Sequence, residues 1–403
     1  MGHNSNRAKS AYIAILLLGI VSLMGDVVYE GSGGIIPDYL KFLGATGVIA
    51  GLVVGFGEFL GNAMRLVSGL LADTTRAYWF FIFLGYGLII SVPLLGVSAT
   101  LELAIILILL ERLGKALRAP SRDAVLSIVS KDVGAGKAFG IHEFLDQVGA
   151  ILGPLLVAAL MFFTRNNYSY TFSFLFIPFL ILLAVLAYAY KRIGYKTMVG
   201  ASKVEGKEKL PKFFYIYTFA VLANTVGLMS AKLILFRASG LLNPQGLQWI
   251  VPLMYLLIQG VDAPTALLSG YAYDKFGIKI LILPFTLSIF PALFAMGGNE
   301  LPALITASIF SGLILGMQES IYRAAVSQLT PIASRGTAYG LFNVVYGFGE
   351  LVSGGIFGLF LDLKVSFIAV VFYAIVTQIF ATILLLMVKR EWKGFIEEKP
   401  GKP

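Results

Sequence analysis

The stretches GLLADTTR, residues 69–76, and GYAYDKFGIK, residues 270–279, are two copies of one motif. Their glycine and aspartate occupy the same places, 201 positions apart. The block GKAFG at 136–140 returns as GTAYG at 336–340, shifted by 200 positions. Because several blocks recur at nearly one offset, the chain is predicted to consist of two related halves.

The composition places these halves in a membrane. Of the 403 residues, 58% are hydrophobic and 13% are charged, and the mean hydropathy is +0.85. That charged share is about half of what a soluble globular protein carries. A soluble protein could not bury so much apolar surface, whereas lipid can cover it. The chain is therefore predicted to be an integral membrane protein.

Apolar runs of the roughly 20 residues that a membrane-spanning helix needs recur along the chain. We expect an all-α fold of about 12 transmembrane helices in two pseudo-symmetric six-helix bundles. The first six are expected at residues 12–40, 46–72, 77–98, 100–121, 138–163 and 169–190. The second six are expected at residues 213–236, 246–272, 278–298, 301–322, 338–360 and 365–388.

Lysine and arginine gather in alternate loops, most densely between the halves and at the C-terminal end. By the positive-inside rule both termini are expected in the cytoplasm, with the protein in the cell inner (plasma) membrane. The polar run between the halves is then a cytoplasmic linker. The predicted division is an N-terminal bundle at 1–192, the linker at 193–211 and a C-terminal bundle at 212–403.

The repeated motif resembles the signature loop of the major facilitator superfamily of transporters. Its second copy matches better, because the first lacks the glycine after its aspartate and keeps one basic residue, Arg76. Arg112 and Gly114 resemble an arginine–glycine element of that family. The resemblance implies the two-bundle fold, transport by alternating access, and a role for Arg112 in handling a proton or the substrate.

The fifth predicted helix carries Gly149, Gly153 and Pro154. They resemble a G-x-x-x-G-P element associated with drug–proton antiporters. The resemblance points to a prokaryotic drug-efflux branch, and the element is expected to kink the helix.

Charged residues in the fourth predicted helix form a stripe along one helical face. They are Glu111, Lys115, Arg118 and Arg122, spaced i, i+4, i+7 and i+11. That face cannot meet lipid, since a central ion is disfavoured by about 2.5–3.5 kcal/mol. One interpretation is a structural ion ladder. The other is a switch, in which the cations pair with Asp73 or Asp123 in one state only.

For gating, we expect Asp73 near Arg122 and Asp274 near Arg323, at the cytoplasmic helix ends. Such clasps would stabilise the outward-open form. The full set of predicted gating residues is Gly69, Asp73, Arg76, Arg118, Arg122, Asp123, Gly270, Asp274 and Arg323.

Acidic residues inside the predicted helices are the candidates for proton coupling, because desolvation disfavours the charged form of an acid. Asp26 and Glu30 share a helical face, and residues 31–34 (GSGG) are expected to break that helix beside them. Alternatively, the two acids merely cap or pair near the outer surface. The candidate set is the acids Asp26, Glu30, Glu58, Glu143 and Asp146, together with the cation Arg112.

Asp146 is the preferred proton carrier of the fifth helix. Its alternative role is a fixed partner of Lys115 or Arg112. His142 is interpreted as a structural side chain.

The second half has fewer ionisable residues, so the first is interpreted as the coupling half. Lys232 lies at about the repeat counterpart of Glu30, where it could oppose an acid or simply snorkel outward. The residues proposed to line a substrate cavity are Asn224, Lys232, Asp262 and Glu350.

These patterns predict a secondary transporter, most simply a monomer, that exports a drug-like or amphiphilic compound in exchange for protons. An uncoupled or differently coupled carrier of a metal ion or organic anion is the alternative, and a non-transporting sensor or scaffold is a different class. The expected partners are a small-molecule substrate, protons and membrane lipids.

Nucleic acid is not an expected partner, since the net charge of +9 lies mainly between apolar segments. With no cysteine and two histidines, no metal site or cofactor is expected. Nor does the chain carry a nucleophile–base pair or a nucleotide-binding loop, so it is not expected to be an enzyme.

Overall fold

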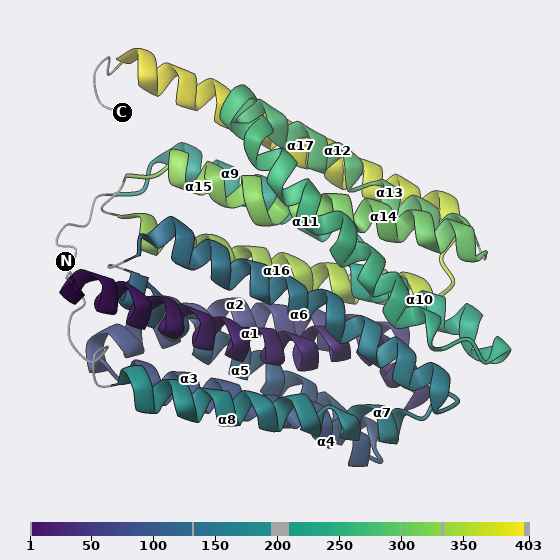
Figure 1. Ribbon diagram of the computed structural model, residues 1–403. Coiled ribbons are helices and arrows are strands. Elements are labelled where there is room, and N and C mark those ends of the chain that lie inside the picture. Colours follow the sequence, from purple (N-terminus) through teal and green to yellow (C-terminus); the bar gives the residue numbers. More distant parts are fainter. Residues whose placement is uncertain (1, 131–132, 195–208, 299, 332–333, 399–403) are drawn as a thin grey trace. The chain divides into compact units, whose positions relative to one another are not determined.

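The computed structural model describes residues 2–130, 133–194, 209–298, 300–331 and 334–398, and the regular elements in these ranges are all helical (Figure 1). The helices before residue 195 are α1 (Gly2–Phe42), α2 (Gly47–Thr75), α3 (Tyr78–Gly87), α4 (Ser91–Leu94), α5 (Leu101–Val129), α6 (Ala135–Phe163), α7 (Tyr168–Phe174) and α8 (Phe176–Ile193). Most of the predicted linker 193–211 lies outside the described residues.

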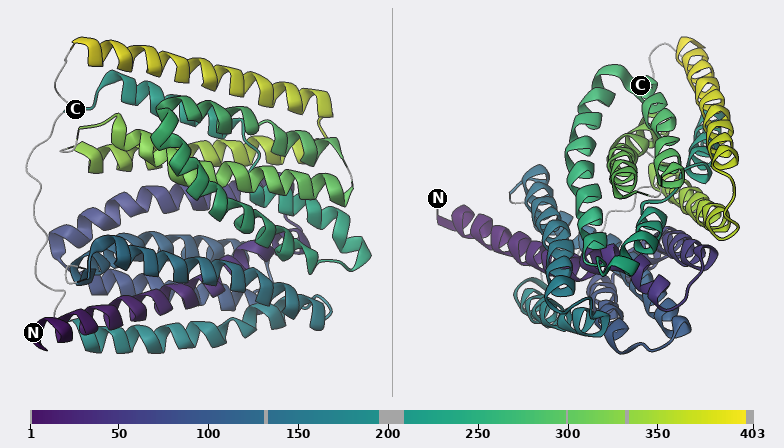
Figure 2. Two further views of the ribbon diagram at one scale, coloured as in Figure 1. Left: turned by 45° about the horizontal axis from the view of Figure 1, so that its top comes forward. Right: turned by 90° about the vertical axis from the view of Figure 1, so that its right-hand side faces the viewer.

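The second half continues with more interrupted helices (Figure 2). They are α9 (Lys212–Val226), α10 (Ala231–Leu242), α11 (Ile250–Phe276), α12 (Ile282–Leu287), α13 (Phe290–Gly297), α14 (Leu301–Met317), α15 (Arg323–Gln328), α16 (Arg335–Asp362) and α17 (Phe367–Glu398). Short 3₁₀ turns lie at Leu88–Ile90 (η1), Leu95–Val97 (η2), Asn243–Gln245 (η5) and Gly277–Leu281 (η6), and Gln318–Tyr322 (η7) is a π-helical turn.

The predicted class, an all-helical membrane protein, is confirmed. Within the described residues, ten helical segments are long and apolar enough to cross a membrane. The 29-residue α5 is an eleventh of sufficient length, although its charged stripe lowers its hydropathy. The longest apolar segment, residues 250–297, covers most of the predicted spans 246–272 and 278–298 and is interrupted at Gly277, whose φ is +61°.

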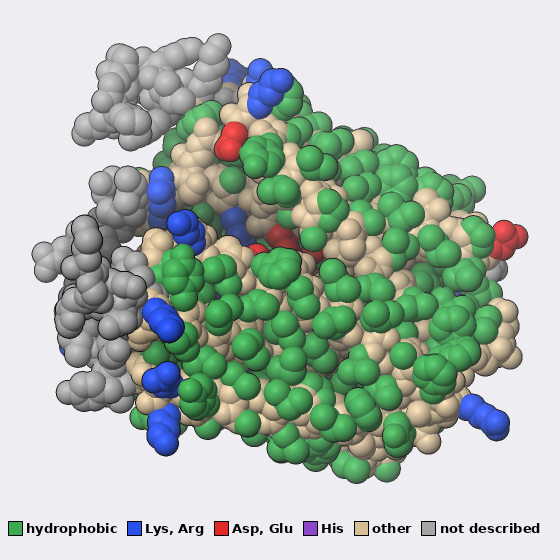
Figure 3. Space-filling model, in the orientation of Figure 1, with side chains coloured by type: hydrophobic (Ala, Val, Ile, Leu, Met, Phe, Trp, Pro, Cys, Tyr) green, Lys and Arg blue, Asp and Glu red, His purple; other side chains and the backbone are tan. Residues whose placement is uncertain are grey.

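Large apolar side chains on the outside of these helices suit contact with lipid. Phe163 is 81% exposed and Ile368 is 78% exposed. Hydrophobic side chains cover most of the face shown in Figure 3. In water such a surface would be strongly disfavoured, whereas acyl chains cover it without penalty.

The chain divides into two compact units. Unit 1 comprises Met1–Gly44, Ala63–Lys203 and Leu242–Leu256. Unit 2 comprises Ala45–Asn62, Val204–Leu241 and Leu257–Pro403. Helix α2 therefore gives its first part to unit 2, and α11 gives its first turns to unit 1. The bundle boundaries drawn from the repeat remain a prediction about related halves of the sequence.

The expected break in the first helix is wrong, because α1 runs without interruption through residues 31–34. These small residues serve close packing instead. A Cβ atom at Gly31 would lie 3.0 Å from the Gly153 carbonyl oxygen, and one at Gly34 would lie 3.1 Å from the Pro252 Cα. Glycine at these places lets neighbouring backbones approach, as is common between membrane helices.

The glycines of α6 have the same role. A Cβ atom at Gly149 would lie 2.6 Å from the Leu23 carbonyl oxygen of α1, and one at Gly153 would lie 2.7 Å from the Gly31 nitrogen. Helix α6 continues through Pro154 as a single element. The glycine–proline element therefore brings α6 against α1, its most extensive neighbour in unit 1.

The helix that does break lies in the second half. Between Val226 and Ala231 the chain leaves the helical conformation, which separates α9 from α10. The Tyr373 hydroxyl donates to the Val226 carbonyl (3.0 Å), and the Ser353 hydroxyl donates to the Leu228 carbonyl (2.5 Å). Side chains of unit 2 thus satisfy the freed carbonyls, as a break at membrane depth requires.

The first part of α2 packs on α16 within unit 2 through facing glycines, since a Cβ atom at Gly51 would overlap the backbone of Gly354. At the start of α2, the Asp362 carboxylate accepts hydrogen bonds from the Gly47 nitrogen (2.6 Å) and the Val48 nitrogen (2.9 Å). A carboxylate there also complements the positive end of the helix dipole.

Replacing Gly153 by Ala tests the close approach of α1 and α6. The new Cβ would collide with backbone, and overpacking of this kind destabilises by about 1–3 kcal/mol. We expect Gly153→Ala to lower the thermal unfolding midpoint of the purified protein. Gly140→Ala on the same helix is the matched control, because its Cβ would meet nothing within 4 Å. Equal midpoints for the two variants would contradict the close approach.

Candidate functional site

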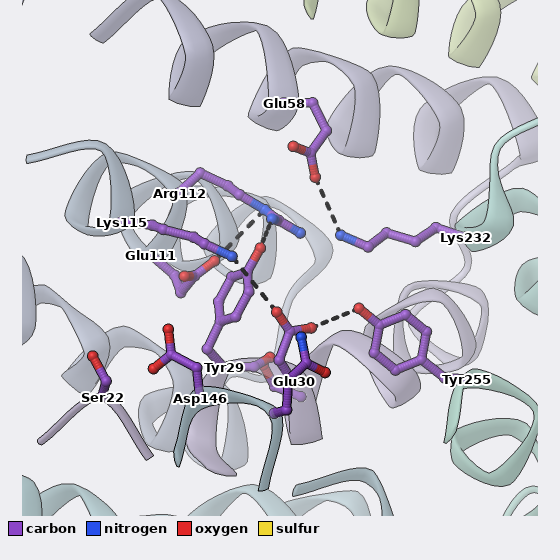
Figure 4. Close-up of polar contacts among 12 residues, drawn as sticks. Ser22, Tyr29, Glu30, Glu58, Glu111, Arg112, Lys115, Asp146, Lys232 and Tyr255 are labelled. Atoms are coloured by element: carbon purple, nitrogen blue, oxygen red, sulfur yellow. Dashed lines mark hydrogen bonds and ion pairs between the residues drawn. The ribbon is translucent and has the colours of Figure 1, made fainter. Parts of the chain in front are cut away.

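The charged stripe of α5 faces the interior of unit 1, as predicted. Of the stripe, Glu111 is 2% exposed and Arg118 is 3% exposed, and Arg112, beside the stripe, is 6% exposed. These side chains meet polar residues of α1 and α6 in one network (Figure 4). A charge held in so little water is stable only when partners surround it.

Tyr29 of α1 lies at the centre of the first part of this network. Its hydroxyl accepts a hydrogen bond from Arg112 Nη1. Its ring lies below the Lys115 ammonium, with Nζ 3.7 Å from the ring centroid, and 5.0 Å from the Arg112 guanidinium carbon. One aromatic side chain thus holds two cations of α5, partly through its π face.

Glu30 completes this part. Its Oε1 lies 3.5 Å from Lys115 Nζ, and its Oε2 accepts a hydrogen bond of 2.6 Å from the Tyr255 hydroxyl of α11. Arg112 is further balanced by Glu111, with Nε 3.6 Å from Oε2. Glu30 thus pairs with Lys115 as part of the network inside unit 1.

Asp146 of α6 organises the second part. Its Oδ2 lies 3.6 Å from Arg122 Nη1 and 3.7 Å from His142 Nδ1. The expected fixed partners, Lys115 and Arg112, are replaced by Arg122 because Asp146 lies nearer the end of α5 that carries it.

Ser22 of α1 connects this part to the rest of unit 1. Its hydroxyl lies 2.9 Å from His142 Nε2 and 3.0 Å from the Tyr86 hydroxyl, and it accepts from Arg122 Nη1 at 3.1 Å. His142 is 3% exposed and held on both ring nitrogens, which agrees with its interpretation as a structural side chain.

Two members of the network have no close partner of opposite charge. Arg118 stacks on the Tyr86 ring at 5.0 Å, and its Nη1 has no hydrogen-bond partner. Asp26 forms no ion pair or hydrogen bond within the described ranges, although Asp146, Glu30, Lys115 and Arg118 all lie within electrostatic reach. An unpaired acid and an unpaired base therefore share one network.

The expected clasps are absent from this structure, as far as the described residues go. The Asp73 carboxylate accepts from the Tyr78 hydroxyl at 3.1 Å, while Arg122 pairs with Asp123 (2.9 Å) and Asp146. Asp73 lies at the exposed end of α2, whereas the Arg122 side chain points toward α1 and α6. The two side chains therefore do not meet.

The second clasp is also absent within the described ranges. Asp274 and Arg323 are both exposed and form no ion pair with each other. The Arg323 carbonyl accepts from the Tyr339 hydroxyl at 3.0 Å. The gating glycines lie in helices, with Gly69 facing Pro120 and Gly270 facing Ser320, and Arg76 is exposed with φ +56°.

Other predicted residues lie away from the unit 1 network. Glu143 is exposed on α6 and accepts from Gln147 at 3.4 Å. Asp262 of α11 is 5% exposed within unit 2.

Asn224 is fully buried and bonded to Ser288, Gln378 and Tyr322 of unit 2. In this structure Asn224 is therefore a packing residue beside the α9–α10 break, which corrects its assignment to an open cavity.

Glu58, Lys232 and Glu350 come together within unit 2, and we call them the unit 2 acid–base group. Lys232 Nζ lies 3.4 Å from Glu58 Oε1 (Figure 4). Both groups lie within electrostatic reach of the Glu350 carboxylate on α16. Lys232 is thus held by an acid rather than extended outward alone, which decides against simple snorkelling.

Sequence reasoning missed the tyrosines of the network. Tyr29 was available to it, because it lies three residues after Asp26 and beside Glu30, on the face that these acids share. Tyr255 offered no signal, since it comes from a segment 225 positions from Glu30. The buried pair of Asp38 and Tyr168, whose hydroxyl donates to Oδ2 at 2.7 Å, was also missed.

Among the residues described, no three His, Cys, Asp or Glu side chains are placed so that they could hold a metal ion.

The comparisons with known proteins agree with this architecture. The sequence matches the profile of the Major Facilitator Superfamily over residues 12–296 and 212–403. An uncharacterised protein of Mycobacterium tuberculosis is 34% identical over 392 residues, which cover 95% of this chain and 94% of that protein. An uncharacterised MFS-type transporter of Methanocaldococcus jannaschii is 28% identical over 384 residues, which cover 93% and 94%.

The crystal structure of the nucleoside transporter NupG is similar with a TM-score of 0.68, over 94% of this chain and 99% of that chain. The sequence identity is 13%, so this likeness concerns the fold alone.

Substitutions at Tyr29 test how the network is held. Tyr29→Phe removes one acceptor from the buried Arg112, which disfavours folding by about 1–3 kcal/mol. Tyr29→Leu also removes the ring beside Lys115, whose side chain is 30% exposed, a further loss of about 1 kcal/mol. We expect the thermal unfolding midpoint to fall in the order wild type, Phe, Leu. Tyr170→Phe, at an exposed ring, is the control; a Tyr29→Phe midpoint equal to that control would contradict the arrangement.

Proposed function

Because this chain belongs to the major facilitator superfamily, we propose that it is a proton-coupled exporter of a drug-like or amphiphilic compound. Membership makes it a secondary transporter that moves a small molecule across a membrane, not an enzyme. The proton coupling, the direction and the compound class are the proposal.

The main support for proton coupling is that Asp26, an acid of the unit 1 network, is unpaired. Glu30 and Asp146 each lie near a cation, at 3.5 Å from Lys115 and 3.6 Å from Arg122. Asp26 lies between these pairs without a cation of its own. Because a nearby cation favours the ionised form of an acid, Asp26 is the acid that gains most from binding a proton.

A proton on Asp26 would change the balance of the whole network. With Asp26 ionised, Arg118 and Lys115 are attracted toward α1. With Asp26 neutral, that attraction is lost and the two cations are held by their remaining partners, Tyr86 and Glu30. A shift of α5 relative to α1 then follows from one protonation, which is how a proton gradient could drive alternating access. The force available is about 2.3 kcal/mol per charge per 100 mV, plus the pH difference.

Export of an amphiphile rests on the sequence element Gly149 to Pro154, which resembles that of drug–proton antiporters. In the structure this element brings α6 against α1, where a Cβ atom at Gly149 would lie 2.9 Å from the Asp26 Cβ. The same glycine therefore lets Asp26 and Asp146 share one network. An element common to antiporters would thus serve the coupling site directly.

For the location, we propose an inner-membrane protein with both termini in the cytoplasm, as the positive-inside rule favours. The chain has no cysteine, so single cysteines can be labelled without background. In intact cells a membrane-impermeant maleimide should label Arg165→Cys and leave Lys191→Cys unlabelled until the membrane is opened. Labelling with the opposite sidedness would reverse the proposed topology.

Single neutralisations test the coupling. In proteoliposomes with an imposed pH gradient, Asp26→Asn should reduce the movement of ethidium and of uncharged chloramphenicol to the level of empty liposomes. Binding of the probes without a gradient should survive, since Asp26 handles the proton. Glu30→Gln and Asp146→Asn are expected to slow transport less than Asp26→Asn does. The amide that replaces either acid still has hydrogen-bonding partners beside it.

Glu143→Gln is the matched control on α6, because this acid is exposed outside the network. Gradient-driven transport at the wild-type rate in all three neutralised variants would exclude coupling through these acids. An uncoupled carrier would then be the better account.

A further inference from the structure

The run GSGG at residues 31–34 of α1 does not break the helix, and the coupling proposed above makes no use of it. Its last two glycines form a seat for Tyr255 of α11. A Cβ atom at Gly34 would lie 3.2 Å from the Tyr255 Cβ, and one at Gly33 would lie 3.5 Å from the Tyr255 hydroxyl oxygen. Because both positions lack a side chain, Tyr255 can lie directly against the backbone of α1.

The seat brings the Tyr255 hydroxyl to a carboxylate. The hydroxyl donates to Glu30 Oε2 at 2.6 Å, while Oε1 of the same acid lies 3.5 Å from Lys115 Nζ (Figure 4). A length of about 2.5–2.7 Å is typical of a hydroxyl bonded to an ionised carboxylate, and such bonds are roughly twice as strong as neutral ones. Glu30 therefore holds α11 with one oxygen and α5 with the other.

Helix α11 belongs to both compact units, and Tyr255 lies just before the point where the helix passes from one to the other. The segment up to Leu256 belongs to unit 1. From Ile258 onward α11 packs on α14 of unit 2, since a Cβ atom at Gly312 would lie 2.6 Å from the Ile258 carbonyl oxygen. A weaker hold on Tyr255 would therefore free the unit 1 end of a helix that is anchored in unit 2.

Lys115 links Glu30 to Asp26, the proposed proton carrier, because its ammonium lies within electrostatic reach of both acids. While Asp26 is ionised, the two carboxylates share the ammonium, and Glu30 keeps more of its charge for Tyr255. Once Asp26 is neutral, the ammonium is drawn to Glu30 alone and competes with the Tyr255 hydroxyl for it.

Other charged groups surround these residues on every side. They are Tyr29 of α1, Arg65 of α2, Glu111, Arg112 and Arg118 of α5, and Asp146 of α6. Asp26 differs from the acids Glu111 and Asp146 in forming no ion pair within the described ranges. A change in its charge therefore acts on Lys115 without first breaking another bond.

We propose that Tyr255 is a positioning residue of the transport cycle: its hydrogen bond to Glu30 holds the first turns of α11 against α1, and a proton on Asp26 loosens that hold through Lys115. The proton thus acts on a helix that both units share. This inference rests on the proposed coupling through Asp26 and names the residue that passes the change on.

Trp249 is a natural reporter of the held state. It directly precedes α11, and its ring lies 5.2 Å from the Phe162 ring of α6. The chain has three tryptophans, so Trp79→Phe with Trp392→Phe leaves Trp249 as the single fluorophore. In the full-length chain in lipid nanodiscs, acrylamide should quench Trp249 severalfold more strongly in acidic than in alkaline buffer, because the loosened segment admits the quencher.

Tyr255→Phe keeps the ring on its seat and removes the hydroxyl alone. Losing a hydrogen bond to a charged acceptor should shift the ratio of held to loosened protein about tenfold toward the loosened form. Quenching should then be strong in both buffers. Tyr271→Phe is the matched control on the same helix, because this side chain is 69% exposed, and it should keep the wild-type response to pH.

Asp26→Asn separates a link to the network from a merely structural role of Tyr255. The amide stands for the protonated acid and leaves the Tyr255–Glu30 bond in place. Quenching should nevertheless be strong in both buffers, as in Tyr255→Phe, since Lys115 is then drawn to Glu30 alone.

Quenching that does not change with pH in the wild type, or a pH response that survives in Tyr255→Phe or in Asp26→Asn, would overturn the inference. The two proposals fail separately. A response absent from both variants, together with gradient-driven transport indifferent to Asp26→Asn, would sink the coupling and leave the role of Tyr255 standing. Transport lost in Asp26→Asn, with a response that Tyr255→Phe retains, would do the reverse.

Discussion

The constraint on which this structure depends is the free energy of holding charge where water is scarce. Helix α5 carries Glu111, Arg112, Lys115, Arg118 and Arg122 on one side, and none of them can face lipid. Each must find a carboxylate, a hydroxyl or an aromatic face inside unit 1. The positions of α1 and α6 follow from that need, since they carry Tyr29, Glu30 and Asp146.

Glycine makes this network possible. Charged side chains can meet only if the helices that carry them approach closely, and a Cβ atom at Gly149 or Gly153 would collide with the backbone of α1. The same residues that serve packing thus determine which acids share a network. Packing and electrostatics depend on each other in this part of the molecule, because a shift of α1 or α6 would separate Asp26 from Asp146.

In unit 2 the corresponding constraint is an irregular backbone, whose polar groups must be hydrogen-bonded. The break between α9 and α10 frees carbonyl groups, and Tyr373 and Ser353 satisfy them. Beside the break, Asn224 is held by hydrogen bonds to Ser288, Gln378 and Tyr322.

The amino-acid sequence by itself determined that the protein is helical and that it lies in a membrane, and it predicts two related halves. These conclusions depend on composition and on a motif repeated at one offset, which are local properties of the chain. It also determined that the α5 stripe faces inward, because helical periodicity places Glu111 and Arg118 on one face. Tertiary structure alone decided the partners: Arg122 for Asp146, Tyr255 for Glu30, and Glu58 for Lys232. The tertiary structure also places the helix break between Val226 and Ala231, whereas the sequence predicted it at residues 31–34. The physical reason is that glycine can either loosen a helix or let another helix approach, and only the presence of a neighbouring backbone decides which.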